Sequence, residues 1–432
     1  MTKMSLDGWT AMKIGVSEED LSQEVLEQYQ LREIRKAIHY TKEHSDFYRE
    51  HLKEFEPDGI LTMKDFQKLP FTSEANLVGQ EWRFQCISAK DVSRVVTVPT
   101  TGTLGNRKRI AFSKKDLQLA HAFAPAGFAA MCSPGDRVAV MMSGNSEGSI
   151  GDSVKKGLLS VGVEAYAYGI IEDLHDAEHF LRFYRPDVIV GIPSQMAVLE
   201  RYMRNSGLFQ LKSLLLSADD VPEALCVRLR NAWKCNTYRH YGMTELCMFG
   251  AVECHAASGY HMRSADHLFE VLNPDEEGYG EIVVTTFHHE AMPLLRYRTG
   301  DIGCMLSSPC DCGSPLFRIG KIKGRINNSI EFPNGRLFLR DIAEIVFSDL
   351  ASIDFECITG KNDVLVVVKA MTGDIPDIEW MKRQMMDLPV MKDVSVVVRC
   401  EITDGLPDNY KVKKRMKKNE DIVYNSISVS SM

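Results

Sequence analysis

The stretch from Thr100 to Lys108 carries residue types that bind a polyanion. It reads Thr-Thr-Gly-Thr-Leu-Gly-Asn-Arg-Lys and follows the β-branched run 95–98, which predicts a strand. Such a loop offers backbone N–H groups, hydroxyls and one ammonium to a ligand, and Gly102 and Gly105 allow close backbone approach because they lack a Cβ. The spacing differs from the GxxxxGK[ST] phosphate loop, since no Ser or Thr follows Lys108. The stretch predicts a bound nucleotide triphosphate, with a plain turn between strands as the alternative.

Two further polar clusters fit the same ligand. The segment Tyr241-Gly242-Met243-Thr244-Glu245 follows a predicted strand at 237–240. It offers a flat ring for a base, close backbone approach, a hydroxyl for the α-phosphate and a carboxylate for Mg²⁺. The segment 296–301 reads Arg-Tyr-Arg-Thr-Gly-Asp, and Asp301 at a strand-to-turn junction can accept hydrogen bonds from both ribose hydroxyls. Viewed singly, each segment also fits a turn or a capping aspartate.

Cysteines and histidines gather in two other segments, 254–261 and 310–313. Thiolates and an imidazole at four positions suit tetrahedral zinc, and a Cys-x-Cys-Gly turn lets both thiolates point inwards. The predicted ligands are Cys254, His261, Cys310 and Cys312, with His255 and Cys304 as spare candidates. Four protein ligands leave no open position for water, which predicts a structural role. The alternative is a set of buried free thiols and surface histidines.

The bulk properties limit the class of protein. The 432 residues are too many for one core and predict two or three domains. A net charge of −8 argues against a general nucleic-acid-binding surface, and the chain lacks an apolar run of the ~20 residues that a membrane span needs. The N-terminus lacks an apolar signal core, and eleven cysteines suit free thiols or metal ligands. We therefore expect a cytoplasmic protein without a membrane or nucleic-acid partner.

Strands alternate with helices along most of the chain. Helices are expected over 20–55 and, with Ser113 as N-cap, over 114–128. Strands are expected at 138–142, 187–192, 214–216 and 282–285. This alternation predicts an α/β fold with a mostly parallel sheet.

After Gly324-Arg325 the composition changes. Helices are expected at 342–347 and 377–387, and strands at 355–359, 364–369 and 394–399. These elements predict a separate α+β unit of about 100 residues. We therefore predict an N-terminal domain over 1–323 and a C-terminal domain over 324–432.

Taken in order, these clusters resemble the motifs of the adenylate-forming superfamily of acyl-CoA synthetases. The stretch 100–108 resembles its phosphate loop, 241–245 its YGxTE motif, 298–301 its RTGD motif and 324–325 the GR before its hinge. The chain is most similar to the phenylacetate–CoA ligase branch. That similarity rests on Phe47-Tyr48-Arg49, Leu69-Pro70-Phe71-Thr72 and the segment 293–301, and it spans about residues 30–415.

The resemblance implies a large multi-layer α/β N-terminal domain and a small mobile α+β C-terminal domain. It implies activation of a small carboxylic acid by ATP and Mg²⁺ to an acyl-adenylate, followed by transfer to the thiol of coenzyme A. Adenylation supplies the leaving group that a carboxylate lacks, and positioning and charge neutralisation do most of the work.

The resemblance also implies roles for single residues. The β- and γ-phosphates would be held by Thr100, Thr101, Gly102, Thr103, Gly105 and Lys108. Tyr241, with Gly242 beside it, would stack on adenine, Thr244 would bond the α-phosphate and Glu245 would bind Mg²⁺. Asp301 would hold the ribose with Arg325 nearby. The strand end with Ala218 and Asp219 would line the adenine pocket.

The superfamily's adenylating lysine is expected near the C-terminus. Here the matching segment lacks the usual glycine, so Lys411 and Lys413 are both candidates, with Lys411 preferred. The segment 143–152 lacks the aromatic residues expected of a phenylacetate enzyme, which leaves the acid open. A protein thiol or an amine as acceptor, and an inactive nucleotide-binding homologue, are the alternative functions. The sequence leaves the oligomeric state open, a homodimer included.

Overall fold

The computed structural model describes residues 5–99, 107–142, 144, 146–204, 210–407 and 416–418. Several predicted ligand-binding positions fall outside these described residues. They are Thr100, Thr101, Gly102, Thr103, Gly105, Lys411 and Lys413. None of the helices in the described ranges is long and apolar enough to cross a membrane.

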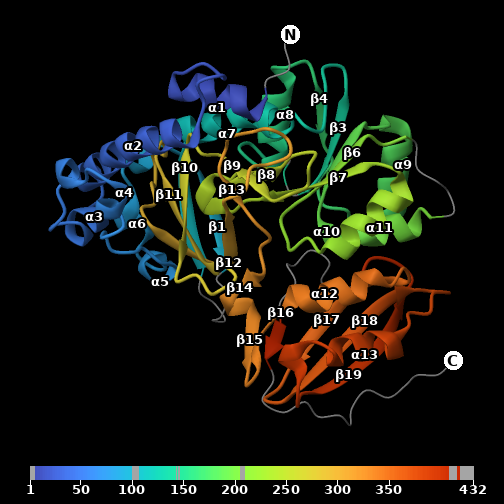
Figure 1. The fold of residues 1–432 in the computed structure, drawn as a ribbon. Helices are drawn as coiled ribbons and strands as arrows, with labels where there is room; N and C mark the ends of the chain where they lie inside the picture. The colour runs from blue at the N-terminus through green and yellow to red at the C-terminus, as the bar shows by residue number, and fades with distance from the viewer. Residues whose placement is uncertain are drawn as a thin grey trace.

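A twelve-stranded sheet forms the centre of the large unit (Figure 1). Five of its strands are parallel, in the order β4-β3-β5-β6-β7. They are β3 (Arg137–Met141), β4 (Glu164–Ala167), β5 (Val188–Gly191), β6 (Ser213–Leu216) and β7 (Asn236–Tyr241). The crossover helices are α8 (Ile150–Leu159), α9 (Leu174–Tyr184), α10 (Pro193–Tyr202) and α11 (Glu223–Trp233). This half has the α/β alternation that the sequence predicts.

The other half of the sheet is antiparallel, so the prediction of a mostly parallel sheet is wrong. Beyond β7 the order is β8, β9, β13, β12, β11 and β10, and β14 also pairs with β12. These strands are β8 (Ala251–Glu253), β9 (Tyr260–Met262), β10 (His267–Leu272), β11 (Tyr279–Thr286), β12 (Tyr297–Leu306), β13 (Arg318–Ile319) and β14 (Gly324–Arg325). Short connections without α-helices join them, and only antiparallel neighbours can be joined by tight turns.

Helices and a hairpin from the N-terminal part pack against the antiparallel half (Figure 1). The helices are α1 (Leu6–Ile14), α2 (Gln23–His44), α3 (Asp46–His51), α4 (Met63–Phe66), α5 (Glu74–Leu77) and α6 (Glu81–Phe84). The helix predicted over 20–55 is interrupted at Ser45, which has an extended backbone. The Ser45 side chain accepts a hydrogen bond from Tyr48 N–H and so caps α3. The hairpin is β1 (Val92–Pro99) with β2 (Arg107–Ser113).

Helix α7 (Lys114–Gly127) has Ser113 as its N-cap, as predicted. The Ser113 hydroxyl accepts from Asp116 N–H, and the Asp116 carboxylate accepts from Ser113 N–H, which is a capping box. This reciprocal cap fixes where β2 ends and α7 begins. Phe123 on α7 is 1% exposed and belongs to the core shared with the sheet.

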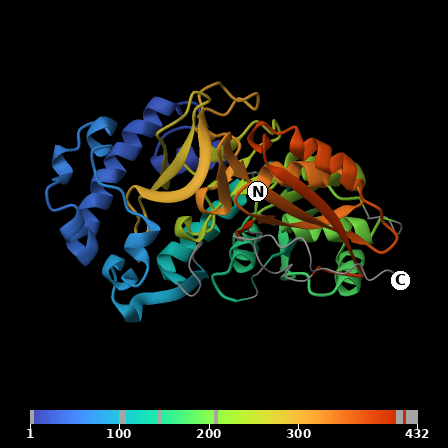
Figure 2. The ribbon, with the colours of Figure 1, turned by 90° about the horizontal axis from the view of Figure 1, so that it is seen from below.

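The C-terminal unit contains the two helices and three strands that the sequence predicts: α12 (Leu339–Ser348), α13 (Ile378–Met386), β17 (Ser352–Thr359), β18 (Asp363–Met371) and β19 (Ser395–Thr403). It also contains three strands that were not predicted, β15 (Ser329–Phe332), β16 (Gly335–Phe338) and β20 (Met416–Lys418). Its sheet has the order β19-β18-β17-β20. Figures 1 and 2 show this unit against the parallel half of the large sheet, away from helices α2–α6.

Specific contacts join the two units. The Glu344 carboxylate on α12 accepts from the N–H groups of Glu223 and Ala224 at 3.0 and 2.9 Å, and so caps α11 across the interface. Arg201 on α10 pairs with Asp374 of the C-terminal unit. The predicted boundary between 323 and 324 stays a prediction, although β14, at 324–325, still pairs with the large sheet.

Candidate functional site

The predicted nucleotide-binding residues gather where the parallel strands end. Strand β6 ends at Leu216 and β7 at Tyr241, and open parallel sheets bind ligands outside these carboxyl ends. The backbone there is strained: Ala218 has a φ of +75° and Met248 a φ of +73°, in the left-handed region that residues with a Cβ avoid. Such strain is concentrated at functional sites in proteins.

Gly242 holds the loop after β7 in a tight turn. A Cβ at this position would lie 1.9 Å from the carbonyl oxygen of Met248 and 2.5 Å from Cε1 of His240. Only glycine fits, because real Cβ atoms do not approach backbone that closely. The turn places the short 3₁₀ helix η3 (Thr244–Leu246), and with it the predicted phosphate hydroxyl and magnesium carboxylate, beside β7.

Lys108 and Glu245, far apart in sequence, form a buried ion pair. Lys108 Nζ lies 2.5 Å from Glu245 Oε1, and the two residues are 4% and 3% exposed. The Tyr297 hydroxyl completes the group, at 3.2 Å from Lys108 Nζ and 3.3 Å from Glu245 Oε1. Burial alone would raise the pKa of Glu245, but the Lys108 ammonium brings that pKa below its usual value. Glu245 is therefore ionised at neutral pH.

Asp301 is held by two donors. The Tyr241 hydroxyl donates to Asp301 Oδ2 at 2.8 Å, and Arg325 Nε donates to Asp301 Oδ1 at 2.9 Å. Strand pairing fixes this contact, since Asp301 on β12 is the register partner of Arg325 on β14. Burial and the Asp301 charge raise the pKa of Tyr241 well above its usual value, so its hydroxyl stays protonated. Each Asp301 oxygen retains acceptor capacity for a further hydroxyl.

The segment Leu69–Thr72 supports this site, although the sequence suggested no role for it beyond family likeness. Thr72 N–H donates to Arg296 O at 3.0 Å, and Arg298 N–H donates to Thr72 O at 2.9 Å. The Arg296 guanidinium lies 4.1 Å from the centre of the Phe71 ring and donates to Leu69 O at 2.6 Å. The N-terminal part thus fixes the start of the strand that carries Asp301.

Ser217 and His240 form a polar pair, a contact that the sequence does not predict. Ser217 Oγ lies 2.8 Å from His240 Nδ1, and His240 Nε2 is buried with no hydrogen-bond partner among the described residues. Burial lowers the pKa of His240 to about 4, so the imidazole is neutral at pH 7. The pair faces a small space with aromatic and aliphatic walls, here named the apolar cavity. Its walls include Phe123, Phe128, Ile150, Val190, Phe249 and Val252.

The aromatic walls come from α7 and from the loop before β8, whereas the sequence analysis looked for them at 143–152. Of that segment, Ile150 lines the apolar cavity. The available signal was the presence of Phe123 and Phe128 in the helix predicted after the phosphate stretch. Large apolar residues predict burial, however, and give no indication that a cavity lies there.

The four residues predicted to bind zinc come together in the fold. One candidate ligand atom from each of Cys254, His261, Cys310 and Cys312 lies within 4.8 Å of the others. Cys254 Sγ lies 3.6 Å from Cys310 Sγ, and Cys312 Sγ lies 3.4 Å from His261 Nε2. Ligands about 2.0–2.3 Å from a tetrahedral zinc ion are about 3.3–3.8 Å apart, a range that includes both of these distances. We call this group the Cys/His cluster.

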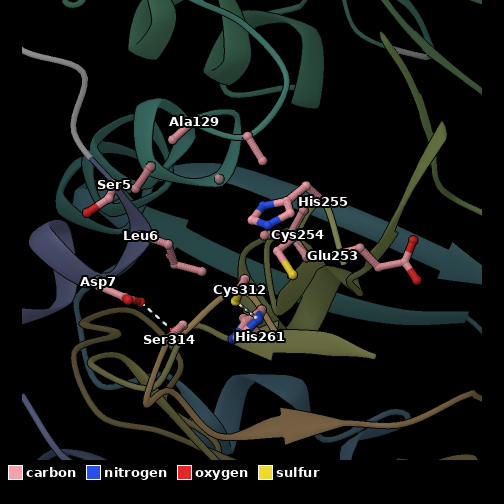
Figure 3. A pocket seen from close by; sticks show the side chains of 14 residues that line it. Ser5, Leu6, Asp7, Ala129, Glu253, Cys254, His255, His261, Cys312 and Ser314 are labelled. Atoms are coloured by element: carbon pink, nitrogen blue, oxygen red, sulfur yellow. Dashed lines mark hydrogen bonds between the residues drawn. The ribbon is translucent and has the colours of Figure 1, made fainter. Parts of the chain in front are cut away.

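A second space of about 410 Å³, the cluster cavity, lies beside the Cys/His cluster (Figure 3). The start of α1 forms one side of it, where Ser314 Oγ donates to Asp7 Oδ1 at 2.6 Å. Cys254, His261 and Cys312 line the other side, together with His255, a spare candidate. Cys304, the other spare candidate, is buried on β12 and is no part of the cluster.

The predicted nucleotide-binding residues within the described ranges lie in two groups. Lys108 and Glu245 form one group, and Tyr241, Asp301 and Arg325 form the other. Gly242 and Thr244 belong to the loop that runs from Tyr241 to Glu245. Ala218 and Asp219 lie at the end of the neighbouring strand β6. The roles assigned to all of these residues in ligand binding stay predictions.

The fold is a large α/β unit with a half-parallel sheet, polar loops at its strand ends and a smaller α+β unit. A search with models of protein families finds no match. Curated relatives do match, and they indicate similarity to the phenylacetate–CoA ligase-like branch of the adenylate-forming superfamily. The phenylacetate–CoA ligase of Thermus thermophilus is 27% identical over 332 residues, covering 72% of this chain and 73% of that protein. The Pseudomonas putida enzyme is 25% identical and covers 76% of this chain and 77% of its own.

Solved structures show the same fold. A 2-hydroxyisobutyryl-CoA ligase in the postadenylation state, bound to an acyl-AMP, has a TM-score of 0.78 at 16% identity. That match covers 92% of this chain and 89% of the other. A structure of 2-hydroxyisobutyryl-CoA ligase in the thioesterification state, with an acyl-AMP and CoA, has a lower TM-score of 0.64 at 17% identity over 91% and 90% of the two chains. The TM-score is thus higher for the postadenylation structure of that neighbour than for its thioesterification structure.

Proposed function

We propose that the protein is an AMP-forming acid–CoA ligase, which activates a carboxylic acid with ATP and transfers the acyl group to coenzyme A. One observation carries the proposal: residues from four separate segments join in two charge-balanced groups at the carboxyl ends of the parallel strands. The Lys108–Glu245 pair supplies a cation and a carboxylate for a metal-bound polyphosphate. The Tyr241–Asp301–Arg325 group supplies a carboxylate fixed for a sugar.

The reaction balances as two displacements. An oxygen of the acid forms a bond to the α-phosphorus of ATP, the bond from that phosphorus to the bridging oxygen breaks, and pyrophosphate leaves. The thiolate of coenzyme A then bonds to the acyl carbon, the bond from that carbon to the AMP oxygen breaks, and AMP leaves. The protein has little covalent chemistry to do, so it binds, orients and neutralises charge.

The Lys108–Glu245 pair must exchange partners when the nucleotide binds. A carboxylate oxygen is a preferred Mg²⁺ ligand, and Glu245 fits that role because it is ionised and buried. When bound, Mg²⁺ would neutralise phosphate charge beside Glu245. The Lys108 ammonium would then turn from Glu245 to a phosphate oxygen, a distance within the reach of its flexible chain. In the absence of the ligand, each of the two buried charges thus neutralises the other.

The apolar end of the acid would enter at the apolar cavity, whose walls must move apart to admit it because the free space there is about 10 Å³. Neutral His240 and Ser217 supply the polar side chains of its lining, and the remaining walls are apolar. An acid with an apolar body and one carboxylate fits this surface, since the body replaces water from apolar walls.

The C-terminal lysine completes the proposal. Lys411 and Lys413 lie outside the described residues, so their assignment rests on the family resemblance. Residues 324–432 would rotate between the two half-reactions, and this motion must break the Glu344 cap on α11 and the Arg201–Asp374 pair.

Acid-dependent exchange of pyrophosphate into ATP tests the function directly. A panel of small aliphatic and aromatic acids should include at least one that supports exchange, and AMP release with that acid should rise when coenzyme A is added. Exchange without a response to coenzyme A would favour a protein thiol or an amine as acceptor. Absence of exchange with every acid would favour an inactive homologue. Exchange that survives both Lys411→Ala and Lys413→Ala would remove the lysine assignment.

We also propose that the Cys/His cluster binds a structural zinc ion. Three thiols and an imidazole within 4.8 Å of one another form the donor set of a closed tetrahedral site. Metal analysis of the purified protein should find one zinc per chain, lost in Cys310→Ser and kept in Cys304→Ser. Less than stoichiometric zinc in the wild type, with Cys310→Ser as stable as the wild type, would remove this proposal. The cytoplasmic location and a homodimer stay predictions.

A further inference from the structure

The apolar cavity and the cluster cavity are neighbours. Gly127 and Val252 line both of them. The apolar cavity contains about 10 Å³ of free space, room for about one water molecule. The cluster cavity contains about 410 Å³, within the range of ordinary small-molecule sites. Gly127, Val252 and the residues around them therefore form the wall between the apolar cavity and the cluster cavity.

Val252 supplies the side chain of this partition. Gly127 has no side chain, and a Cβ there would already lie 3.0 Å from Cε1 of Phe123. Val252 is 5% exposed, and its branched side chain has few rotamers, so it closes the gap firmly. The depth of the apolar cavity thus depends on one β-branched residue.

The strand that carries Val252 is fixed on both sides. In the register of the sheet, Val252 on β8 faces His240 on β7 and His261 on β9. Cys254 follows Val252 by two residues. The partition therefore lies between the pair that opens the apolar cavity and two members of the Cys/His cluster, and a displacement of the cluster moves β8 directly.

We infer that Val252 is the specificity-determining residue for acid length, and that the Cys/His cluster holds it in place. This inference rests on the proposed ligase function and adds a substrate class, namely short, compact apolar acids. A longer acyl chain meets Val252. Shortening this side chain joins the apolar cavity to the cluster cavity, and the added space lies along the path that a longer chain would follow.

The first test compares straight-chain acids from two to eight carbons in the pyrophosphate exchange assay. The wild type should prefer the short acids. Val252→Ala should raise kcat/KM for the eight-carbon acid relative to the four-carbon acid by about tenfold or more, since one methylene in an apolar pocket is worth about that much. Val190→Ala is the matched control, because Val190 is a buried valine that lines the apolar cavity and not the cluster cavity.

Three outcomes overturn the inference. They are a wild type that uses long and short acids equally, an unchanged preference in Val252→Ala, and an equal change in Val190→Ala. If Val252→Ala does not fold, Val252→Leu serves instead, and it should shorten the preferred acid. Absence of exchange with any acid in the wild type overturns the proposed function itself, which is a distinct result.

The second test measures binding and needs no turnover. Two stable acyl-adenylate analogues, sulfamates with four-carbon and eight-carbon chains, are titrated calorimetrically into the zinc-loaded protein, the metal-depleted protein and Cys310→Ser. The zinc-loaded protein should bind the four-carbon analogue more tightly than the eight-carbon analogue. The ratio of these two affinities should be closer to one in the metal-depleted protein and in Cys310→Ser. Cys304→Ser should keep the wild-type ratio. If the affinity ratio is unchanged in protein shown to lack metal, the Cys/His cluster has no role in selecting the acid.

Discussion

The two polar groups of the large unit are built in opposite ways. At the candidate nucleotide site, Lys108 faces Glu245 and Arg325 faces Asp301, each within 3 Å. The Cys/His cluster instead gathers three thiols and an imidazole, four possible metal ligands with no cationic side chain among them. A paired site is complete before its ligand arrives and must exchange partners. A cluster of metal ligands gains its stability when the metal binds. The first design suits turnover, and the second suits a permanent cofactor.

Breaking the buried pair should have the largest effect on stability. Lys108→Met leaves the Glu245 charge buried and unpaired, which should cost about 3–5 kcal/mol in the free energy of unfolding. Lys108→Met with Glu245→Gln should recover most of that loss, because both charges are then gone. Urea unfolding followed by circular dichroism measures both. Lys115→Met, at an exposed position on α7, is the control and should change little.

A double variant no more stable than Lys108→Met would mean that packing, and not charge, explains the loss. Because the Lys108–Glu245 pair is proposed to exchange partners on nucleotide binding, the double variant should also be inactive despite its recovered stability.

Metal removal should have the next largest effect. A ligand present at a hundred times its Kd stabilises the folded state by about 2.7 kcal/mol. The melting temperature of the wild type should therefore rise with added zinc and fall with a chelator, whereas Cys310→Ser should respond to neither. Cys304→Ser should respond like the wild type. If a chelator leaves the wild-type melting temperature unchanged, the Cys/His cluster does not depend on a bound metal for stability, and the proposed difference from the ion-paired site is wrong.

The same contrast explains what the sequence could predict. The Cys/His cluster was predictable to the residue, because few residue types bind zinc and two short segments supplied them all. The antiparallel half of the sheet was not predictable, because a short apolar strand such as 282–285 has the same residue pattern whether it pairs in parallel or antiparallel. Pairing direction depends on the connections, and these became visible only in the fold.

The ion pair between Lys108 and Glu245 was also unpredictable in detail. Each residue was singled out for a role toward the ligand, but 137 residues separate them and no pattern links them. The apolar cavity was not predicted for a related reason: Phe123 and Phe249 come from distant segments, and each alone looks like an ordinary core residue. A cavity is defined by what surrounds it, and that information is not local in sequence.

Asp301→Asn should weaken nucleotide binding with a smaller effect on stability. The amide keeps an acceptor for the Tyr241 hydroxyl but loses the charge that pairs with Arg325 and strengthens hydrogen bonds from a ribose. A hydrogen bond to a charged group is worth about 1.5–3 kcal/mol, so the KM for ATP should rise about tenfold to a hundredfold. Asp275→Asn, in an exposed turn after β10, is the control. An unchanged KM for ATP would remove Asp301 from the nucleotide site.

The smallest effect, taken per pH unit, should come from His240, whose burial lowers its pKa to about 4, below the ordinary value of 6.5. Between these two values the unfolded chain binds a proton that the folded protein does not, so stability falls as pH decreases through this window. One such proton changes the free energy of unfolding by about 1.4 kcal/mol per pH unit.

His240→Gln should flatten the pH dependence by that amount between about pH 6 and 4.5, measured by urea unfolding at a series of pH values. Burial also lowers the pKa values of His261 and His289 to about 4, and their contributions stay in both proteins, so the difference between the curves isolates His240. Parallel curves would mean that His240 is solvated enough to titrate normally. In that case the apolar cavity beside it would be wet, and an apolar acid would gain much less by entering it.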